Sequence, residues 1–179
     1  MSDVDLNQPI QSISQHLNTL TDKERHQTLF KCCGSERWAT RVCEASPFAS
    51  DDALFLKAKE IWHELSRQDY LEAFSHHPQI GADPEQLREK FKGTHQWASH
   101  EQSGMREASE ACIQELAQRN REYYDRFGYI FIVCATGKTA NEMLTLLKAR
   151  LSNAQDTELL IAANEQAKIT QIRLEKLTS

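Results

Sequence analysis

The chain has 179 residues, enough for one domain with a sizeable core, and its hydrophobic fraction of 40% and charged fraction of 26% are typical of a globular protein. A formal net charge of −5 at pH 7, without any basic run, argues against nucleic acid and anionic membranes as partners. No apolar run approaches the roughly 20 residues of a membrane helix and the polar N-terminal residues do not resemble a signal peptide, so we expect a cytoplasmic location.

Helix signals dominate the first third of the chain. Thr21 begins a segment of capping-box form, which Gly34 ends. Ser35 is a suitable cap for the next helix, which ends before Pro47, and Ser50 for the one after that. Helical spacing then continues in an apolar stripe made of Ala58, Ile61, Trp62 and Leu65.

The helical pattern resumes on both sides of an interruption at His77-Pro78. Tyr70, Leu71 and Phe74 continue it up to that point. Beyond it, Asp83 and Pro84 form a cap and first helical position for a short helix that ends at Phe91. A long helix is predicted from Gln96 to Tyr124, with one apolar side made of Met105, Ala108, Cys112 and Leu116.

Two more helices are predicted towards the C-terminus. The first carries a stripe of Ala140, Met143, Leu144, Leu147 and Leu151. Thr157 is the predicted cap of the last helix, whose apolar face includes Leu160, Ile169, Ile172 and Leu177. The chain is therefore predicted to be all-α: a single-domain helical bundle over residues 1–179, with about eight to ten helices and no significant β-sheet.

The segment 129–135 departs from this pattern. Its aromatic and β-branched residues are typical of a buried strand, but the sequence offers no second strand with which it could pair. We therefore expect a tightly packed extended stretch between Gly128 and Gly137. Its backbone N–H groups would need partners, which a ligand could supply, although the segment could equally be plain apolar core.

Cysteine and histidine spacing gives no metal site. The five cysteines are odd in number and lack Cys-x-x-Cys spacing, which favours reduced, partly buried thiols: Cys32, Cys33, Cys43, Cys112 and Cys134. The seven histidines do not form His-Glu-x-x-His or another ligand spacing on one helical face.

The corner at His77-Pro78 is the strongest candidate for chemistry. Proline disfavours the α region for the preceding residue, so His77 must lie at a helix break. An imidazole on a rigid corner is well placed for proton transfer near neutral pH. Gly81 then permits the chain to turn. A His-Pro pair that ends a helix and has no functional role gives the same pattern, and that interpretation stays open at this point.

Four groups of motifs follow one another in order along the chain. They are His77-Pro78-Gln79-Ile80-Gly81; Glu101-Gln102-Ser103-Gly104-Met105; Asn120-x-x-Tyr123-x-x-x-Phe127-Gly128-Tyr129-x-Phe131-Ile132-Val133-Cys134-Ala135; and Arg150-Leu151-x-Asn153 with Ile169-x-x-x-Arg173-Leu174. Together they resemble the 2-oxo-4-hydroxy-4-carboxy-5-ureidoimidazoline (OHCU) decarboxylases, the last enzymes of the oxidative route from urate to (S)-allantoin. The resemblance extends from about Leu29 to Leu177.

The resemblance implies an all-α homodimer that decarboxylates OHCU without a metal or an organic cofactor and protonates the product on one face. It also implies that His77 is catalytic and, we expect, that Glu101 assists by orienting His77 or binding substrate N–H groups. The implied substrate-binding residues are Pro78, Ala98, Ser99, His100, Glu101, Gln102, Phe131, Ile132, Val133, Cys134, Ala135 and Arg173. Ala98 stands where many members have serine, so one hydroxyl contact is replaced or lost, and Ser99 could compensate for it.

Two other functions are compatible with parts of the sequence. A non-catalytic helical binding module would explain the helix punctuation without any pocket around His77 and Glu101. A thiol-dependent hydrolase would use Cys134 as its nucleophile, but a nucleophilic cysteine needs an activating base or a positive field, and no motif supplies one.

Overall fold

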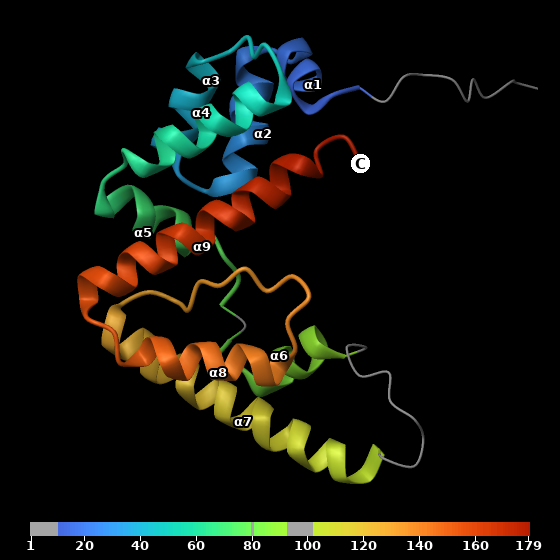
Figure 1. The fold of residues 1–179 in the computed structure, drawn as a ribbon, viewed down its shortest axis with the longest axis vertical. Helices are drawn as coiled ribbons and strands as arrows, with labels where there is room; N and C mark the ends of the chain where they lie inside the picture. Colours follow the sequence, from blue (N-terminus) through green and yellow to red (C-terminus); the bar gives the residue numbers. More distant parts are fainter. Residues whose placement is uncertain (1–10, 80, 93–101) are drawn as a thin grey trace, which may run out of the picture. The chain divides into compact units, whose positions relative to one another are not determined.

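The structure is a computed structural model that describes residues 11–79, 81–92 and 102–179, with the side chains of its longest helix described from residue 110. In these ranges it contains nine α-helices and no strand (Figure 1), which confirms the predicted all-α class. The helices are α1 (Ile13–Thr19), α2 (Asp22–Cys33), α3 (Glu36–Glu44), α4 (Asp51–His63), α5 (Arg67–Ser75), α6 (Pro84–Phe91), α7 (Gln102–Phe127), α8 (Ala140–Leu151) and α9 (Gln155–Glu175).

The chain forms two compact units. Unit 1 comprises Met1–Glu72 and Ala167–Ser179, and unit 2 comprises Ala73–Gln166. The boundaries fall inside helices α5 and α9, so each of these helices contributes residues to both units. The assignment of residues 1–179 to a single domain stays a prediction.

Unit 1 is built from four capped helices with the first part of α5 and the last part of α9. Helix α2 packs against α3, and α4 packs against both α3 and α1. The core holds fully buried leucines and two tryptophans, among them Trp38, whose indole N–H donates to the carbonyl of Ala58 at 2.9 Å. This bond satisfies the only polar atom of a large buried side chain.

The predicted caps of unit 1 are confirmed. The side chains of Thr21, Ser35 and Ser50 each accept a hydrogen bond from a backbone N–H in the first turn of α2, α3 and α4. Helix α2 ends at Gly34, whose φ of 85° lies in the left-handed region that glycine adopts without strain. Helix α1 was not predicted, although Ser12 and Gln15 form a capping box at its start.

The longest helix, α7, lies in unit 2 and packs against both α6 and α8. The apolar stripes predicted for α7 and α8 face the core of unit 2. Cys112 and Leu116 of α7 are buried, and so are Met143, Leu144 and Leu147 of α8. Asp83 caps α6 as expected, with Pro84 at the first helical position. The long helix ends at Phe127, three residues beyond the predicted Tyr124, and its predicted start at Gln96 lies outside the described residues.

The prediction for the last helix was wrong in two respects. Helix α9 begins at Gln155, so Thr157 lies within its first turn and does not cap it. Leu160 is 60% exposed and does not belong to the apolar face. The buried positions include Leu159, Ala162, Ala163 and Gln166, which follow i, i+3, i+4, i+7 spacing, and Leu160 is rotated away from this face by about 100°.

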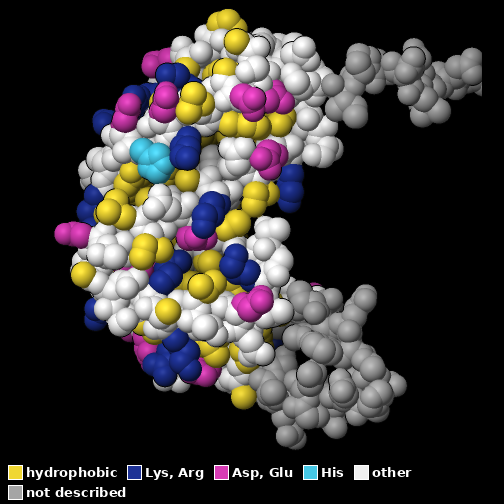
Figure 2. Space-filling view, in the orientation of Figure 1, with side chains coloured by type: hydrophobic (Ala, Val, Ile, Leu, Met, Phe, Trp, Pro, Cys, Tyr) yellow, Lys and Arg dark blue, Asp and Glu magenta, His cyan; other side chains and the backbone are white. Residues whose placement is uncertain are grey.

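Acidic and basic side chains are interspersed on the visible surface (Figure 2), in keeping with the modest net charge of −5. Among the described helices, none is both long enough and apolar enough to span a bilayer.

Candidate active site

His77 lies on the turn that follows α5. After the helix ends at Ser75, the N–H of His77 donates to the carbonyl of Phe74 at 3.2 Å, and Pro78 then leads the chain away. The prediction of a helix break at His77 is therefore confirmed. His77 is half-buried, whereas His76 and Pro78 are exposed, so His77 is the less accessible of the two histidines.

A buried glutamine of α9 holds the imidazole of His77. The Nε2 atom of His77 is hydrogen-bonded to Oε1 of Gln166, and the side chain of Gln166 is completely buried. Sequence reasoning did not select Gln166. The available signal was its position on the buried face of α9, where a polar residue needs a specific partner.

Two of the motif groups meet at Gly81. A Cβ atom built on Gly81 would lie 2.9 Å from the side chain of Asn120 in α7, closer than nonbonded atoms normally approach. The amide of Asn120 is itself held, because its Nδ2 donates to the carbonyl of Leu116 at 2.9 Å. Gly81 lies in a turn, as expected, and the close approach of Asn120 also explains why this position has no side chain.

The segment 129–135 is neither helix nor strand, in agreement with the expected extended stretch. Tyr129 and Ile132 are buried, and the other residues are half-buried. Side chains hold both backbone polar groups of Cys134: its N–H donates to Glu165 Oε2 at 2.8 Å, and its carbonyl accepts from Lys138 Nζ at 2.8 Å.

The other amides of this segment differ from that of Cys134. No described residue accepts a hydrogen bond from the N–H groups of residues 131–133 or of Ala135. Cys134 was among the expected amide donors to substrate, yet its N–H already has a carboxylate acceptor in this structure. Glu165, which supplies that acceptor, was not identified from the sequence.

A buried ion pair anchors the same segment. Arg150 donates to Glu158 Oε1 through Nε at 2.7 Å, and its Nη1 donates to the carbonyl of Ile132 at 2.6 Å. Neither side chain of the pair is more than 9% exposed. Arg150 also lies over the ring of Phe131, 4.4 Å from its centroid. The pair therefore ties helix α8 to both α9 and the extended segment.

Tyr123 and Asn153 complete this cluster. The hydroxyl of Tyr123 donates to Glu158 Oε1 at 2.5 Å, and Nδ2 of Asn153 donates to Glu158 Oε2 at 2.9 Å. Burial, followed by the hydrogen bond to Glu158, raises the pKa of Tyr123 far above its ordinary value. The Arg150-Leu151-x-Asn153 motif thus supplies two partners of one buried carboxylate.

Arg173 belongs to unit 1. It is half-buried, and its Nη1 donates to the carbonyl of Cys32 at 3.3 Å. Burial raises the pKa of Cys32 to about 11 and that of Cys33 to about 12, and the positive charge of Arg173 opposes both shifts. The predicted role of Arg173 as a substrate ligand stays a prediction.

Several predicted site residues cannot be placed. Ala98, Ser99, His100 and Glu101 lie outside the described residues, and Gln102 is the first residue of α7, with a side chain that is also outside them.

Among the described side chains, no group of three or more histidine, cysteine, aspartate or glutamate residues could hold a metal ion. All five cysteines are described and are free thiols.

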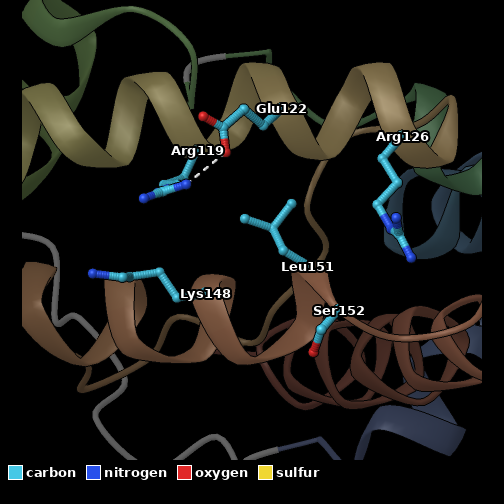
Figure 3. A pocket seen from close by; sticks show the side chains of 6 residues that line it. All are labelled: Arg119, Glu122, Arg126, Lys148, Leu151 and Ser152. Atoms are coloured by element: carbon cyan, nitrogen blue, oxygen red, sulfur yellow. Dashed lines mark hydrogen bonds and ion pairs between the residues drawn. The ribbon is translucent and has the colours of Figure 1, made fainter.

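A groove between α7 and α8 does not contain any predicted site residue (Figure 3). It is lined by Arg119, Glu122, Arg126, Lys148, Leu151 and Ser152. Its basic side chains already have partners: Arg119 binds Glu122 at 2.8 Å, Lys148 binds Glu115 at 2.8 Å, and Arg126 donates to the carbonyl of Asn153 at 3.0 Å. Because these side chains are already engaged, the groove is a weaker candidate for ligand binding than the surroundings of His77.

The protein is thus an all-α protein in which polar contacts hold a histidine at a helix break. Comparison with known proteins identifies its family. Residues 18–175 match the sequence model of the family described as OHCU decarboxylase. The chain therefore belongs to the OHCU decarboxylase family, a family of carboxy-lyases.

Relatives and solved structures agree with this assignment. The chain is 41% identical over 150 residues to the uric acid degradation bifunctional protein TTL of Arabidopsis thaliana, which covers 83% of this chain and 45% of that protein. It is 26% identical to the OHCU decarboxylase of Halalkalicoccus jeotgali, over 78% of this chain and 76% of that protein. A crystal structure of OHCU decarboxylase in the presence of (S)-allantoin matches with a TM-score of 0.66 and 38% identity, covering 89% of this chain and 99% of that one.

The chain is shorter than some of these relatives. It spans less than half of the Arabidopsis protein and 31% of the uric acid degradation bifunctional protein PucL of Bacillus subtilis, to which it is 29% identical.

Proposed function

We propose that this protein converts OHCU to (S)-allantoin and CO₂ in urate catabolism, with proton delivery to one face of the intermediate. The observation that carries the proposal is the half-buried His77 imidazole, held at a helix break in a chain that matches the OHCU decarboxylase family over residues 18–175. An imidazole can accept and release a proton near pH 7, which is what this reaction requires.

The substrate supplies its own electron sink. One ring carbon carries both the carboxylate and a hydroxyl group and is bonded to the carbon of an imine. When the bond to the carboxylate breaks, CO₂ leaves and the electron pair forms a carbon–carbon double bond, while the imine nitrogen takes up a proton. The resulting enol loses its hydroxyl proton and gains one at the neighbouring carbon, so one proton is consumed overall. No pyridoxal or thiamine group is needed for this step.

We assign the proton transfers to His77. Positioned general acid–base catalysis of this kind contributes about 10²–10⁴-fold to the rate. For Glu101 we propose a supporting role, either orienting His77 or accepting hydrogen bonds from the ring and ureido N–H groups. Gln102 can both donate and accept, which suits an amide-rich ring.

Backbone amides of residues 131–135 are proposed to bind the oxygen atoms of the substrate. Residues 131–133 and Ala135 are better candidates than Cys134, because no described residue accepts from their N–H groups while Cys134 donates to Glu165. For Pro78 and for Ala98 through His100 we propose contacts to the substrate without assigning an atom, and for Arg173 a bond to a carboxylate or carbonyl oxygen.

The test is stereochemical. OHCU is generated in situ from urate, and allantoin formation is followed by circular dichroism. Because spontaneous decay gives the racemate, a dichroic signal of the (S) enantiomer reports catalysis directly. A reaction mixture that yields racemic allantoin at the uncatalysed rate would contradict the proposal.

The His77→Asn variant tests the assigned catalyst. It should keep the helical fold and lose about 10²–10⁴-fold in kcat, since asparagine preserves hydrogen bonding but does not exchange protons near pH 7. His76→Asn is the matched control, because His76 is adjacent in sequence but exposed, and its rate should stay near that of the original protein. Full activity of His77→Asn would remove His77 from the mechanism.

We also propose that the protein is a homodimer and that it works in the cytoplasm. Light scattering tests the first point, since a dimer has twice the 20.6 kDa mass of the chain. A monomeric mass at working concentration would contradict it.

A further inference from the structure

The contact between His77 and Gln166 joins residues that are 89 positions apart in the sequence. Gln166 follows the apolar positions Leu159, Ala162 and Ala163 on the buried face of α9 and is itself completely buried. A fully buried amide loses its hydrogen bonds to water, so its orientation is determined by the protein groups around it. The imidazole therefore meets a partner with little freedom to move.

The atom that Gln166 presents determines where the histidine carries its proton. Oε1 of an amide has lone pairs and no hydrogen, so the ring nitrogen that faces it must be the donor. A neutral imidazole has only one N–H group, and its second nitrogen is then an acceptor. A donating Nε2 leaves the lone pair on Nδ1.

We propose that Gln166 is a positioning residue, which holds neutral His77 as the Nε2–H tautomer and leaves Nδ1 as the atom that accepts and returns the proton during catalysis. This inference rests on the proposed decarboxylase function. It goes beyond that function by assigning a role to Gln166 and by naming the reactive nitrogen of His77.

A neutral partner suits this task better than a carboxylate would. A carboxylate at the same position would stabilise the imidazolium form and raise the pKa of the histidine. An amide oxygen fixes the tautomer and orientation without adding a negative charge, so the ring keeps both protonation states accessible near neutral pH. Gln166 thus supplies orientation without placing a charge beside His77.

Three variants test the proposal. Gln166→Leu removes the acceptor, Gln166→Glu keeps its shape and adds a negative charge, and Gln171→Leu is the control, a glutamine of the same helix whose side-chain bond to Glu175 is exposed. The tautomer is read from long-range ¹H–¹⁵N NMR spectra, in which the His77 signals are identified by their loss in His77→Asn. The pH profiles of kcat and kcat/KM are measured alongside.

We expect the Nε2–H tautomer to dominate in the original protein and in Gln171→Leu. In Gln166→Leu the tautomers should mix and kcat should fall by about tenfold or more with little change in KM, because orientation is lost and substrate contacts are not. In Gln166→Glu the acidic limb of the kcat/KM profile should move to higher pH by about one unit or more, since the added carboxylate favours the imidazolium.

Dominance of the Nδ1–H tautomer in the original protein would overturn the proposal, as would an unchanged acidic limb in Gln166→Glu. If Gln166→Leu fails to fold, as judged by far-UV circular dichroism, the isosteric Gln166→Glu variant still gives the pH test. Failure of the proposed function is separate: an active His77→Asn variant would end the catalytic assignment while leaving the NMR tautomer result intact.

Discussion

At the residue scale, the cysteines of this protein differ sharply in their expected reactivity. Burial raises the pKa of Cys33 to about 12, so only about 10⁻⁴ of this thiol is ionised at about pH 8. We expect iodoacetamide to label the half-buried Cys43 and Cys134 in the folded protein long before Cys32 or Cys33. Mass spectrometry of the peptides after timed labelling measures the order.

The direction of these thiol shifts also limits their effect on stability. Since the folded-state pKa values lie above the ordinary value of 9.0, the thiols destabilise the fold only as they begin to ionise in the unfolded chain, above about pH 9.

Labelling of Cys33 as fast as Cys134 at about pH 8 would contradict the burial of this thiol, and labelling of all cysteines in urea is the control.

Gly81 leads to a second prediction at this scale. Gly81→Ala should lower the free energy of unfolding by about 1–3 kcal/mol, because the added methyl group meets the Asn120 side chain at 2.9 Å. Urea unfolding of Gly81→Ala, Asn120→Ala and the double variant forms a thermodynamic cycle. The two effects should be less than additive in the double variant, and full additivity would mean that the residues do not interact.

At the scale of elements, the extended segment 129–135 depends on its neighbours for its shape. A segment without helix or strand bonds must have its polar groups satisfied by other means, and here Arg150, Lys138 and Glu165 hold three of them. Side chains of α8, of α9 and of the connection that precedes α8 therefore help to determine the conformation of a stretch that the sequence identifies only as apolar.

Removing one member of the buried ion pair should have a large effect. Arg150→Ala leaves Glu158 buried and charged, which costs about 3–5 kcal/mol in the free energy of unfolding. Arg126→Ala is the matched control: Arg126 is exposed and donates a single bond to the carbonyl of Asn153, so its loss should cost less than about 1 kcal/mol. Equal urea midpoints for the two variants would contradict the role of the pair.

Element boundaries were predictable where local chemistry sets them. Thr21, Ser35, Ser50 and Asp83 cap their helices as expected, because a cap depends only on residues within one turn. The start of α9 was predicted wrongly, since Thr157 is a good cap in isolation but the helix begins earlier. Leu160 shows the same limit, because burial of a helix face is decided by what packs against it.

At the scale of the whole molecule, the decarboxylation chemistry predicts independence from added cofactors. Because the substrate contains its own electron sink, we expect no loss of activity after dialysis against EDTA. Enantiomeric excess of allantoin measured before and after dialysis checks this, with a zinc-dependent hydrolase treated in parallel as a control. A loss of activity that added metal restores would require a metal-assisted mechanism.

The sequence by itself determined the helical class, most helix starts, the break at His77 and the likeness to the OHCU decarboxylases. These depend on spacing, capping and proline chemistry, all of which are local properties of the chain. It identified the Arg150-Leu151-x-Asn153 motif as well, but could not say what the motif does.

Only the tertiary structure decided the partners. Gln166 beside His77, Glu165 at the Cys134 amide, Glu158 at Arg150 and Asn120 at Gly81 are each many residues from the group they contact. No local pattern encodes such a pair, because a buried polar side chain acquires its partner only when distant elements pack together and exclude water.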